Sequence, residues 1–530
     1  MHIVRIGDGA TKPHPAEAIG AKAANLTRMA ALGLPVPPAF VLPIELCAAI
    51  IDKDAQAERR LRDGLKEGME FLERATGKLF GDRRNPLLVS VRSGAARSMP
   101  GMLDTVLDVG CTSDAVHGLI RTTGRPRLAW DCRRRFLESY TETVLNFDPA
   151  PFAACLAALT ASENAAGLRD LDSEALERLA AGEQALIEDL DDGWLDDATA
   201  QLDGAARAVY RSWMSERAQT YRRLQKLDDL RGTAVTVQAM VFGNGGLTSG
   251  AGVAFSRDPS TGQARPMIDV VLDAQGEDVV SGRRTPDTED TIARSLPAIA
   301  AELGDVLKRL EREFGDVQDI EFTIEDAKLW ILQTRSAKRT PRAALRIALD
   351  FVHENLITPD EALQRIDGID LDALTETRLA ATEDPLMSGI GASGGIAVGR
   401  AAFDSESAQR LAASGEPVIL MRPDTSTADV AGFAVAAGIV TAVGARTAHA
   451  ALVARQLGKP CIVGCNGMTI DIAADRAQFS GTTISGGDWI SMDGDSGHIY
   501  QGQREILVTR PDAELAEIGR WRTQTAESLA

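Results

Sequence analysis

The pattern of hydrophobic and polar positions changes several times along the chain. Residues 1–110 mix short apolar runs with Pro and Gly turn signals, which is typical of strands. Residues 112–230 are rich in Ala, Leu, Glu, Asp and Arg and poor in β-branched residues, which predicts a largely helical segment. Within it Val209, Trp213 and Leu224 recur at near-helical spacing, a stripe best interpreted as facing a core.

Short strands return in residues 233–335, and the last two, DIEFTIE and KLWILQT, predict a hairpin around Asp326. Helices follow in residues 341–380 and suggest a connector between domains. Gly-rich turns then alternate with short strands, and a helix over 448–457 is predicted to end at Gly458. This order of strand, helix and strand indicates a second, smaller α/β domain.

The carboxy-terminal tail is predicted to be one helix. Leu515, Ile518 and Trp521 fall at i, i+3 and i+6 and form an apolar stripe. The stripe could lie against a partner or pack back on its own domain. We favour self-packing.

Composition narrows the possible functions. The chain has 57 basic and 76 acidic residues among 530, a net charge of −19, which argues against general nucleic-acid binding. Six dilute cysteines predict packed, reduced thiols. The amino terminus lacks the apolar core of a signal peptide, and no uncharged stretch is long enough to span a bilayer. We therefore expect a soluble cytoplasmic protein with no membrane partner.

Two strands carry a group of polar residues that could bind a metal and phosphate. Asp319 and Glu321 lie two residues apart, so their side chains share one face of a strand, and Gln333 and Arg335 are in phase on the next. Carboxylate, amide and guanidinium groups on one sheet face would make a Mg²⁺-phosphate platform. A solvated sheet face is the alternative. The nucleotide-binding pattern G-x-x-x-x-G-K-[ST] does not occur.

Two further residues stand in unusual settings. Arg92 follows the apolar run LLVSV, and a cation there needs an anionic partner, either a phosphate or a structural carboxylate. His449 falls in the first turn of a predicted helix, with Thr447 as its natural N-cap. The helix N-terminus favours a neutral imidazole, which is a competent nucleophile for a phosphoryl group. A histidine that only hydrogen-bonds locally is the alternative.

Several segments together resemble the pyruvate, phosphate dikinase family, from about residue 18 to about residue 505. They are GAKAANLTRMAALGLPVPPAFVL (20–42), VSVRSGAARSMPGMLDTVLDVG (89–110), AVYRSW (208–213), VQAMVFGNGGLTSGAGVAFSRDPSTG (237–262), AQGEDVVSGRRTP (274–286), QDIEFTIEDAKLWILQTRSAKRT (318–340) and TAHAALVARQLGKPCIVGC (447–465).

The resemblance implies an α/β and α+β multidomain protein. Its parts would be an ATP-grasp nucleotide-binding domain (1–340, with 112–230 as a helical insertion), a helical linker (341–384), a swivelling β/β/α phosphohistidine domain (385–505) and a tail helix (506–530).

The resemblance also implies a role for each matching residue. These are ATP phosphate binding by Lys22 and Arg92, adenine contact by Gln238, Met240 and Val241, nucleotide binding by Asp319, Mg²⁺ coordination by Glu321 and Gln333, phosphate contact by Arg335, phosphoryl transfer through His449 and possible regulatory phosphorylation of Thr447. For Thr447 the N-cap role alone is a sufficient explanation.

Two departures from the family pattern matter. Where the family usually has G-G-M-T-S-H, this chain has Gly444-Ala-Arg446-Thr-Ala-His449, and the family's carboxy-terminal pyruvate-binding barrel is expected to be missing. The predicted reaction is ATP and phosphate giving AMP, pyrophosphate and phosphohistidine at His449. The phosphoryl group would pass to pyruvate or another acceptor on a separate chain.

Two other functions stay open at this stage. The acceptor could be a different small molecule, such as an antibiotic or a phenol. The chain could instead be a non-catalytic, nucleotide-sensing scaffold, although retention of the whole residue set counts against that.

Overall fold

A computed structural model describes most of the chain, namely residues 3–7, 9, 12–97, 99, 102–165, 167–188, 193–280, 289–371, 374–380, 383–424, 429–446, 448–479 and 481–529. Two compact units emerge: unit 1 comprises 1–245 with 330–334, and unit 2 comprises 246–329 with 335–530. Each combines helices with strands, which confirms the predicted mixed α/β class.

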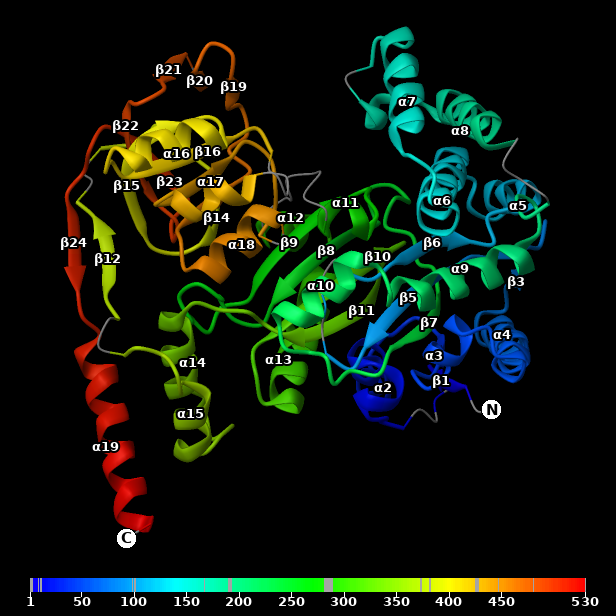
Figure 1. Ribbon diagram of the computed structural model, residues 1–530, viewed down its shortest axis with the longest axis horizontal. Helices are drawn as coiled ribbons and strands as arrows, with labels where there is room; N and C mark the ends of the chain where they lie inside the picture. Colours follow the sequence, from blue (N-terminus) through cyan, green and yellow to red (C-terminus); the bar gives the residue numbers. More distant parts are fainter. Residues whose placement is uncertain are drawn as a thin grey trace. The chain divides into compact units, whose positions relative to one another are not determined.

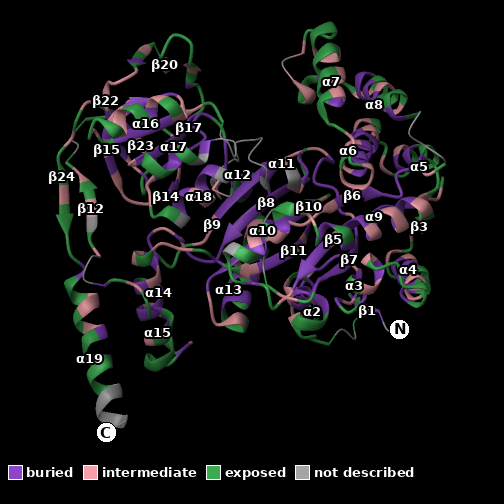
Figure 2. Ribbon diagram, in the orientation of Figure 1, coloured by how far each residue is buried: buried purple, intermediate pink, exposed green. Residues whose placement is uncertain are grey.

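Unit 1 is built on a five-stranded antiparallel sheet. Its strands, in spatial order, are β1 (Val4–Ile6), β2 (Ala39–Leu42), β7 (Thr233–Ala239), β5 (Val89–Ala95) and β6 (Thr105–Val109). Every residue of β7 is buried, as is every residue of β2, so both faces of the sheet are covered there (Figure 2). A short pair, β3 (Leu79–Phe80) and β4 (Pro86–Leu87), lies apart from this sheet.

Helices make up the rest of unit 1. They are α1 (Ala16–Ile19), α2 (Ala21–Ala31), α3 (Leu46–Ile51), α4 (Ala55–Thr76), α5 (Ser113–Thr123), α6 (Pro126–Leu145), α7 (Ala150–Ser162), α8 (Ser173–Ile187), α9 (Ala198–Ser212) and α10 (Glu216–Leu224). The predicted helical segment 112–230 is therefore confirmed. Val209 and Trp213 are buried as predicted, but the stripe spans two helices, because Ser215 caps a new helix.

A four-stranded sheet has the order β11 (Lys328–Ser336), β10 (Gln318–Glu325), β8 (Gly250–Phe255) and β9 (Met267–Leu272). All of it belongs to unit 2 except residues 330–334 of β11, which belong to unit 1. The hairpin between β10 and β11 is confirmed, and both of its turn residues, Asp326 and Ala327, have positive φ. Helices α11 (Gly276–Val280), α12 (Glu289–Ser295) and α13 (Pro297–Phe314) follow β9. The buried positions of α13 recur with helical spacing at Ile299, Leu303 and Leu310.

The predicted connector forms α14 (Pro341–His353) and α15 (Pro359–Arg365), and the tail forms α19 (Asp512–Leu529) (Figure 1). Ile518 is 1% exposed and Trp521 is 8% exposed, in one apolar cluster with residues of α14 and α15. Self-packing of the tail stripe is therefore confirmed.

The remainder of unit 2 is an eight-stranded sheet. In spatial order its strands are β13 (Met387–Ser388), β23 (His498–Gln501), β22 (Trp489–Asp493), β15 (Ile396–Ala402), β16 (Val418–Arg422), β17 (Gly438–Thr441), β18 (Cys461–Val463) and β14 (Ile390–Ser393). The run from β15 to β18 is parallel. It is accompanied by α16 (Ser405–Ala413), α17 (Val430–Val435) and α18 (His449–Leu457). The sequence analysis predicted α18 but missed α16 and α17.

Two small sheets complete unit 2. They are the pair β12 (Glu376–Leu379) and β24 (Ile506–Thr509), and the set β19 (Thr469–Asp471), β20 (Arg476–Phe479) and β21 (Thr482–Ser485).

A buried carboxyl in the helical part of unit 1 predicts how stability depends on pH. Glu183 on α8 is 0% exposed, and burial, followed by the nearby charge of Glu138, raises its pKa to about 9. Between its ordinary pKa and this raised value the folded state holds a proton that the unfolded state has lost. Stability therefore falls as pH rises through this range, by about 1.4 kcal/mol per pH unit at most from this group.

We expect Glu183→Gln to remove this part of the pH dependence. Denaturant unfolding at pH 6 and pH 8 should show a smaller loss of unfolding free energy in the variant than in the wild-type protein. Glu177→Gln, an exposed change on the same helix, is the matched control. An unchanged pH slope in Glu183→Gln would show that the carboxyl is already ionised in the folded state.

Candidate active site

The four-stranded sheet carries a polar face. The guanidinium of Arg335 on β11 donates from Nε to Asp319 Oδ2 on β10 over 2.8 Å. Glu321 lies two residues from Asp319, and Gln333 lies two residues from Arg335, so each pair shares one face of its strand. Asp319 and Gln333 are each 6% exposed. Glu321 and Arg335 are partly exposed, so the face is half-buried and not fully solvated.

The charges on this face are tightly balanced. Burial raises the pKa of Asp319, although Arg335 acts in the opposite direction. Burial also acts to lower the pKa of Arg335, but Asp319 and Glu321 raise it overall. The second carboxylate oxygen of Asp319, Oδ1, is buried and has no hydrogen-bond partner among the described residues. Such an oxygen is suited to a further cationic ligand.

The oxygen donors present fit a magnesium ion. Mg²⁺ prefers carboxylate and amide oxygens together with oxygens of water and phosphate. Glu321, Gln333 and the unpartnered Oδ1 of Asp319 supply donors of this type. Among the described residues, no group of three His, Cys, Asp or Glu side chains forms a complete metal site. A metal held here would therefore need oxygens from its substrate, as Mg²⁺-nucleotide sites generally do.

Positive charge accumulates beside the same face. Burial lowers the pKa of Lys338, and Arg335 and Arg455 lower it further. Arg455 on α18 is itself 6% exposed, and burial lowers its pKa. Like charges gathered in this way are stabilised by an anion, and a phosphate group is the matching ligand.

The structure adds a third carboxylate that the sequence analysis missed. Asp269 on β9 pairs across the sheet with Val253, and Val253 pairs with Glu321, so all three side chains point to one face. Asp269 is 2% exposed and forms an ion pair with Arg446, 177 residues later in the chain. The available signal was one charged residue in an otherwise apolar strand.

His449 lies in the first turn of α18, as predicted, but the helix begins at His449 and not at Ala448; the side chain of His449 lies outside the described part of the structure. The N-cap residue is Ala448, which provides no side-chain hydrogen bond. The prediction that Thr447 caps this helix is wrong, because the helix starts one residue too late for it; Thr447 itself lies outside the described residues. The predicted stop is confirmed, since Gly458 adopts φ 64°.

In unit 1, the two residues predicted to hold phosphates lie on elements that touch. Lys22 is exposed in the first turn of α2, and Arg92 is half-buried on β5. The two elements pack against each other at Gly20 and Gly94. A Cβ on Gly20 would lie 2.2 Å from the carbonyl oxygen of Gly94. Only glycine permits this approach, so the start of α2 is held against the strand of Arg92.

The residues predicted to border adenine lie at the end of β7. Gln238 donates from Nε2 to the carbonyl oxygen of Pro37 over 3.2 Å, and its buried Oε1 has no hydrogen-bond partner among the described residues. The backbone N–H of Met240 donates to the carbonyl oxygen of Leu88 over 2.9 Å. Val241 is 9% exposed.

A buried ion network that the sequence analysis missed supports this segment. Asn244 donates to Asp131 Oδ2 over 2.9 Å, and the same carboxylate binds Arg134 and Arg135, each over 2.9 Å. The two arginines hold the pKa of Asp131 well below its usual range despite burial. The network anchors the chain just after Val241. Its signal was the run Asp-Cys-Arg-Arg-Arg within one predicted helix.

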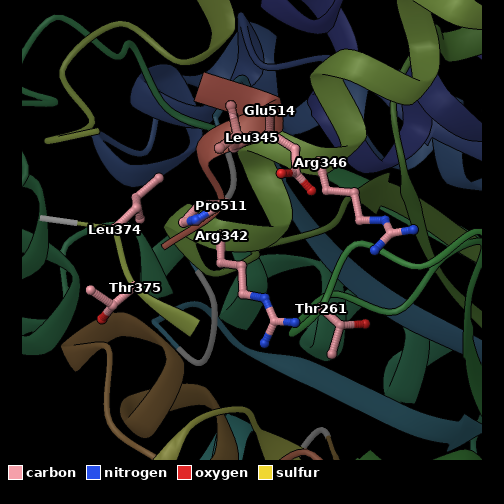
Figure 3. Close-up of a pocket in the computed structure, with 8 residues that line it drawn as sticks. All are labelled: Thr261, Arg342, Leu345, Arg346, Leu374, Thr375, Pro511 and Glu514. Carbon is pink, nitrogen blue, oxygen red and sulfur yellow. The ribbon is translucent and has the colours of Figure 1, made fainter. Parts of the chain in front are cut away.

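Figure 3 shows a pocket of unit 2 away from the predicted site residues. It is lined by Thr261, Arg342, Leu345, Arg346, Leu374, Thr375, Pro511 and Glu514. Arg342 pairs with Asp495 over 3.7 Å and Arg346 with Asp350 over 3.9 Å, so the charge of each arginine is already balanced.

The cysteines behave as packed thiols. None is in a disulfide, and burial raises the pKa of Cys461 and of Cys465 to about 12. Burial and a raised pKa agree with the interpretation of packed structural thiols for this pair.

Comparison with known families covers most of the chain. Residues 57–305 and 289–355 match the family described as pyruvate phosphate dikinase, AMP/ATP-binding domain. Residues 414–497 match the PEP-utilising enzyme, mobile domain. The chain belongs to the pyruvate, phosphate dikinase family. The first match contains Asp319, Glu321 and Arg335, and the second contains His449.

Curated relatives agree with this assignment. The chain is 41% identical over 509 residues to pyruvate, phosphate dikinase of Clostridium symbiosum, covering 95% of this chain and 58% of that protein. It is 40% identical over 523 residues to the Rhizobium meliloti dikinase and 38% identical over 514 residues to pyruvate, phosphate dikinase 2 of Zea mays, each with the same coverage of 95% and 58%. The chain thus spans less than two thirds of the length of these dikinases.

Proposed function

We propose that the chain is an ATP-dependent phosphotransferase that phosphorylates its own His449. ATP and inorganic phosphate would give AMP and pyrophosphate, with the β-phosphoryl group on the imidazole and the γ-phosphoryl group on phosphate. The observation that carries the proposal is the contact network of unit 2: the sheet face of Asp319, Glu321 and Arg335 also bears the partner of Arg446, three residues before His449.

The proposed roles follow from charge and hydrogen bonding. Lys22 and Arg92 bind phosphates of ATP in unit 1, and Arg335 neutralises charge on the transferring group. The unpartnered Oε1 of Gln238 accepts a hydrogen bond from the adenine amino group, and the carbonyl of Met240 is a second acceptor.

Glu321 and Gln333 would hold Mg²⁺, with Asp319 beside them. When bound there, the ion neutralises phosphate charge and fixes phosphate geometry. Arg335 and Asp319 hold each other in place before substrate arrives, so their contribution needs little reorganisation during transfer.

The start of α18 suits a phosphoryl acceptor. Since Ala448 offers no side-chain cap, backbone N–H groups of the first turn are available to an anion, and the helix dipole favours negative charge there. The same field favours a neutral imidazole, the nucleophilic form of His449.

The second half of the reaction is proposed to use an acceptor bound outside these 530 residues, with pyruvate on a separate chain as the first candidate. Movement of the domain that carries His449 between two sites, as the term mobile domain suggests, belongs to the same proposal. No feature of the described residues favours an antibiotic or phenol acceptor or a scaffold role. Regulation through Thr447 stays a prediction.

Nothing among the described helices is long and apolar enough to cross a membrane. The cytoplasmic location predicted from the sequence stays a prediction.

Product analysis tests the proposed reaction. With ATP and Mg²⁺, formation of AMP should depend on added inorganic phosphate and yield pyrophosphate in equal amount, as measured by ion-exchange chromatography. Phosphate dependence is the decisive feature, because transfer of the γ-phosphoryl group to water would not need it. ADP as the sole nucleotide product would contradict the proposal.

A further inference from the structure

The segment that leads into α18 is tied to the four-stranded sheet by one arginine. Arg446 forms an ion pair from Nη1 to Asp269 Oδ1, and its backbone N–H donates to Asp269 Oδ2 over 3.2 Å. Its Nε also donates to the carbonyl oxygen of Gly391 on β14 over 3.1 Å. One side chain thus joins the sheet that bears Glu321 to the sheet that bears α18.

Strand register fixes where this contact falls. Asp269 and Glu321 flank Val253 on one face of the sheet, so they are two strand spacings apart, about 10 Å. The next residues along the same face include Phe255, and the guanidinium of Arg455 lies 6.0 Å from its ring centre. Helix α18 is therefore held over the face that carries the proposed phosphate and metal ligands.

Arg455 fixes the geometry of the same segment from within α18. Its Nη2 donates to the carbonyl oxygen of Arg446 and its Nη1 to that of Ala392, each over 2.6 Å. The backbone of Arg446 is therefore restrained at both its N–H and its carbonyl group. Only two residues separate this restrained point from His449.

We propose that Arg446 is a positioning residue for phosphoryl transfer, which acts by holding the start of α18 on the nucleotide-binding sheet through Asp269. The inference rests on the proposed function, since it gives Arg446 a part in the phosphorylation of His449. It departs from the pattern that the chain resembles, where methionine stands at this position and could not make the ion pair.

The energetics make the pair sensitive to loss of either partner. Asp269 is buried, and burial raises its pKa while Arg446 opposes the rise. Removing one member of a buried pair leaves the other charge without compensation, whereas removing both avoids that penalty. Single substitutions should therefore displace the segment from the sheet at least as strongly as the double substitution does.

The test uses the full chain and variants Arg446→Met, Asp269→Asn, the double variant and Arg446→Lys. Arg410→Met is the matched control, because Arg410 is exposed and pairs with Glu406 of its own helix, α16. The first measurement is the single-turnover rate at which label passes to the protein from saturating ATP labelled at the β-phosphate. The second is the Kd of ATP, measured by equilibrium dialysis.

We expect Arg446→Met to slow transfer at least tenfold while the Kd of ATP changes less than twofold. Asp269→Asn should be slowed similarly, the double variant should be no slower than Arg446→Met, and Arg446→Lys should be intermediate. An unchanged transfer rate in Arg446→Met would overturn this inference but not the proposed function. So would a double variant whose rate falls by the product of the two single effects. Absence of label on the wild-type protein would instead overturn the proposed function, and this inference with it. If Arg446→Met does not bind ATP, Asp269→Asn and Arg446→Lys test the inference instead. A slower transfer rate with a nearly unchanged Kd of ATP would support it, and an unchanged rate would overturn it.

Discussion

Incubation with ATP labelled at the β-phosphate, Mg²⁺ and inorganic phosphate is expected to leave label on the protein, and His449→Asn is expected to abolish it. Asparagine keeps the polarity and approximate size of the side chain but has no nucleophilic ring nitrogen. The linkage should be acid-labile and alkali-stable, which distinguishes a phosphoramidate from a phosphate ester. Acid and alkali treatment of the labelled protein, followed by scintillation counting, measures this.

His14→Asn is the matched control, because His14 is exposed and no site role is proposed for it. It should retain full labelling. Equal labelling of the wild-type protein and His449→Asn would assign the phosphoryl group to another residue. Equal labelling from ATP labelled at the γ-phosphate would contradict transfer of the β-phosphoryl group. It would leave the assignment of His449 as the carrier intact.

Local patterns were sufficient to predict the polar sheet face. The alternation in residues 318–325 and 328–336 predicts two strands, and a period of two residues places Asp319 with Glu321 and Gln333 with Arg335. These predictions use only residues that are close in the sequence, so one amino-acid sequence is enough to make them. The contact between Asp319 and Arg335 across the two strands is supplied by the structure.

Contacts between distant segments could not be predicted in the same way. Asp269 and Arg446 are 177 residues apart, and Asp131 and Asn244 are 113 residues apart. No periodicity links such pairs, because their meeting depends on how whole sheets and helices pack. The sequence showed that Arg446 departs from the resembling pattern, but only the structure supplies the buried carboxylate that compensates its charge.

The N-cap of α18 shows a smaller limit of the same kind. Thr447 and Ala448 both precede His449, and capping preference alone selects the threonine. In the structure Ala448 occupies the cap, and its N–H donates to the carbonyl oxygen of Ala445 over 2.9 Å. The turn before the helix therefore sets its first residue, and the preference of one side chain does not.

Substitution of Arg335 is expected to have the second large effect. Arg335→Met should slow phosphorylation of His449 by about a thousandfold, since a guanidinium that neutralises a transferring phosphoryl group contributes a factor of this order. Arg335→Lys should recover only part of the rate, because an ammonium keeps the charge but not the planar fork that binds two oxygens. Rapid-quench single-turnover measurements at saturating ATP separate this rate from nucleotide affinity.

The loss must be separated from disruption of the sheet, because Arg335→Met also removes the partner of the buried Asp319. Arg339→Met is the control: Arg339 follows the same strand and binds Asp316 through two contacts of 2.7 and 2.8 Å, but has no proposed contact with ATP. The double variant Arg335→Met with Asp319→Asn relieves the unpaired carboxylate. If catalysis needs the guanidinium itself, this double variant regains thermal stability and stays slow. If it regains the transfer rate as well, Arg335 acts only by neutralising Asp319.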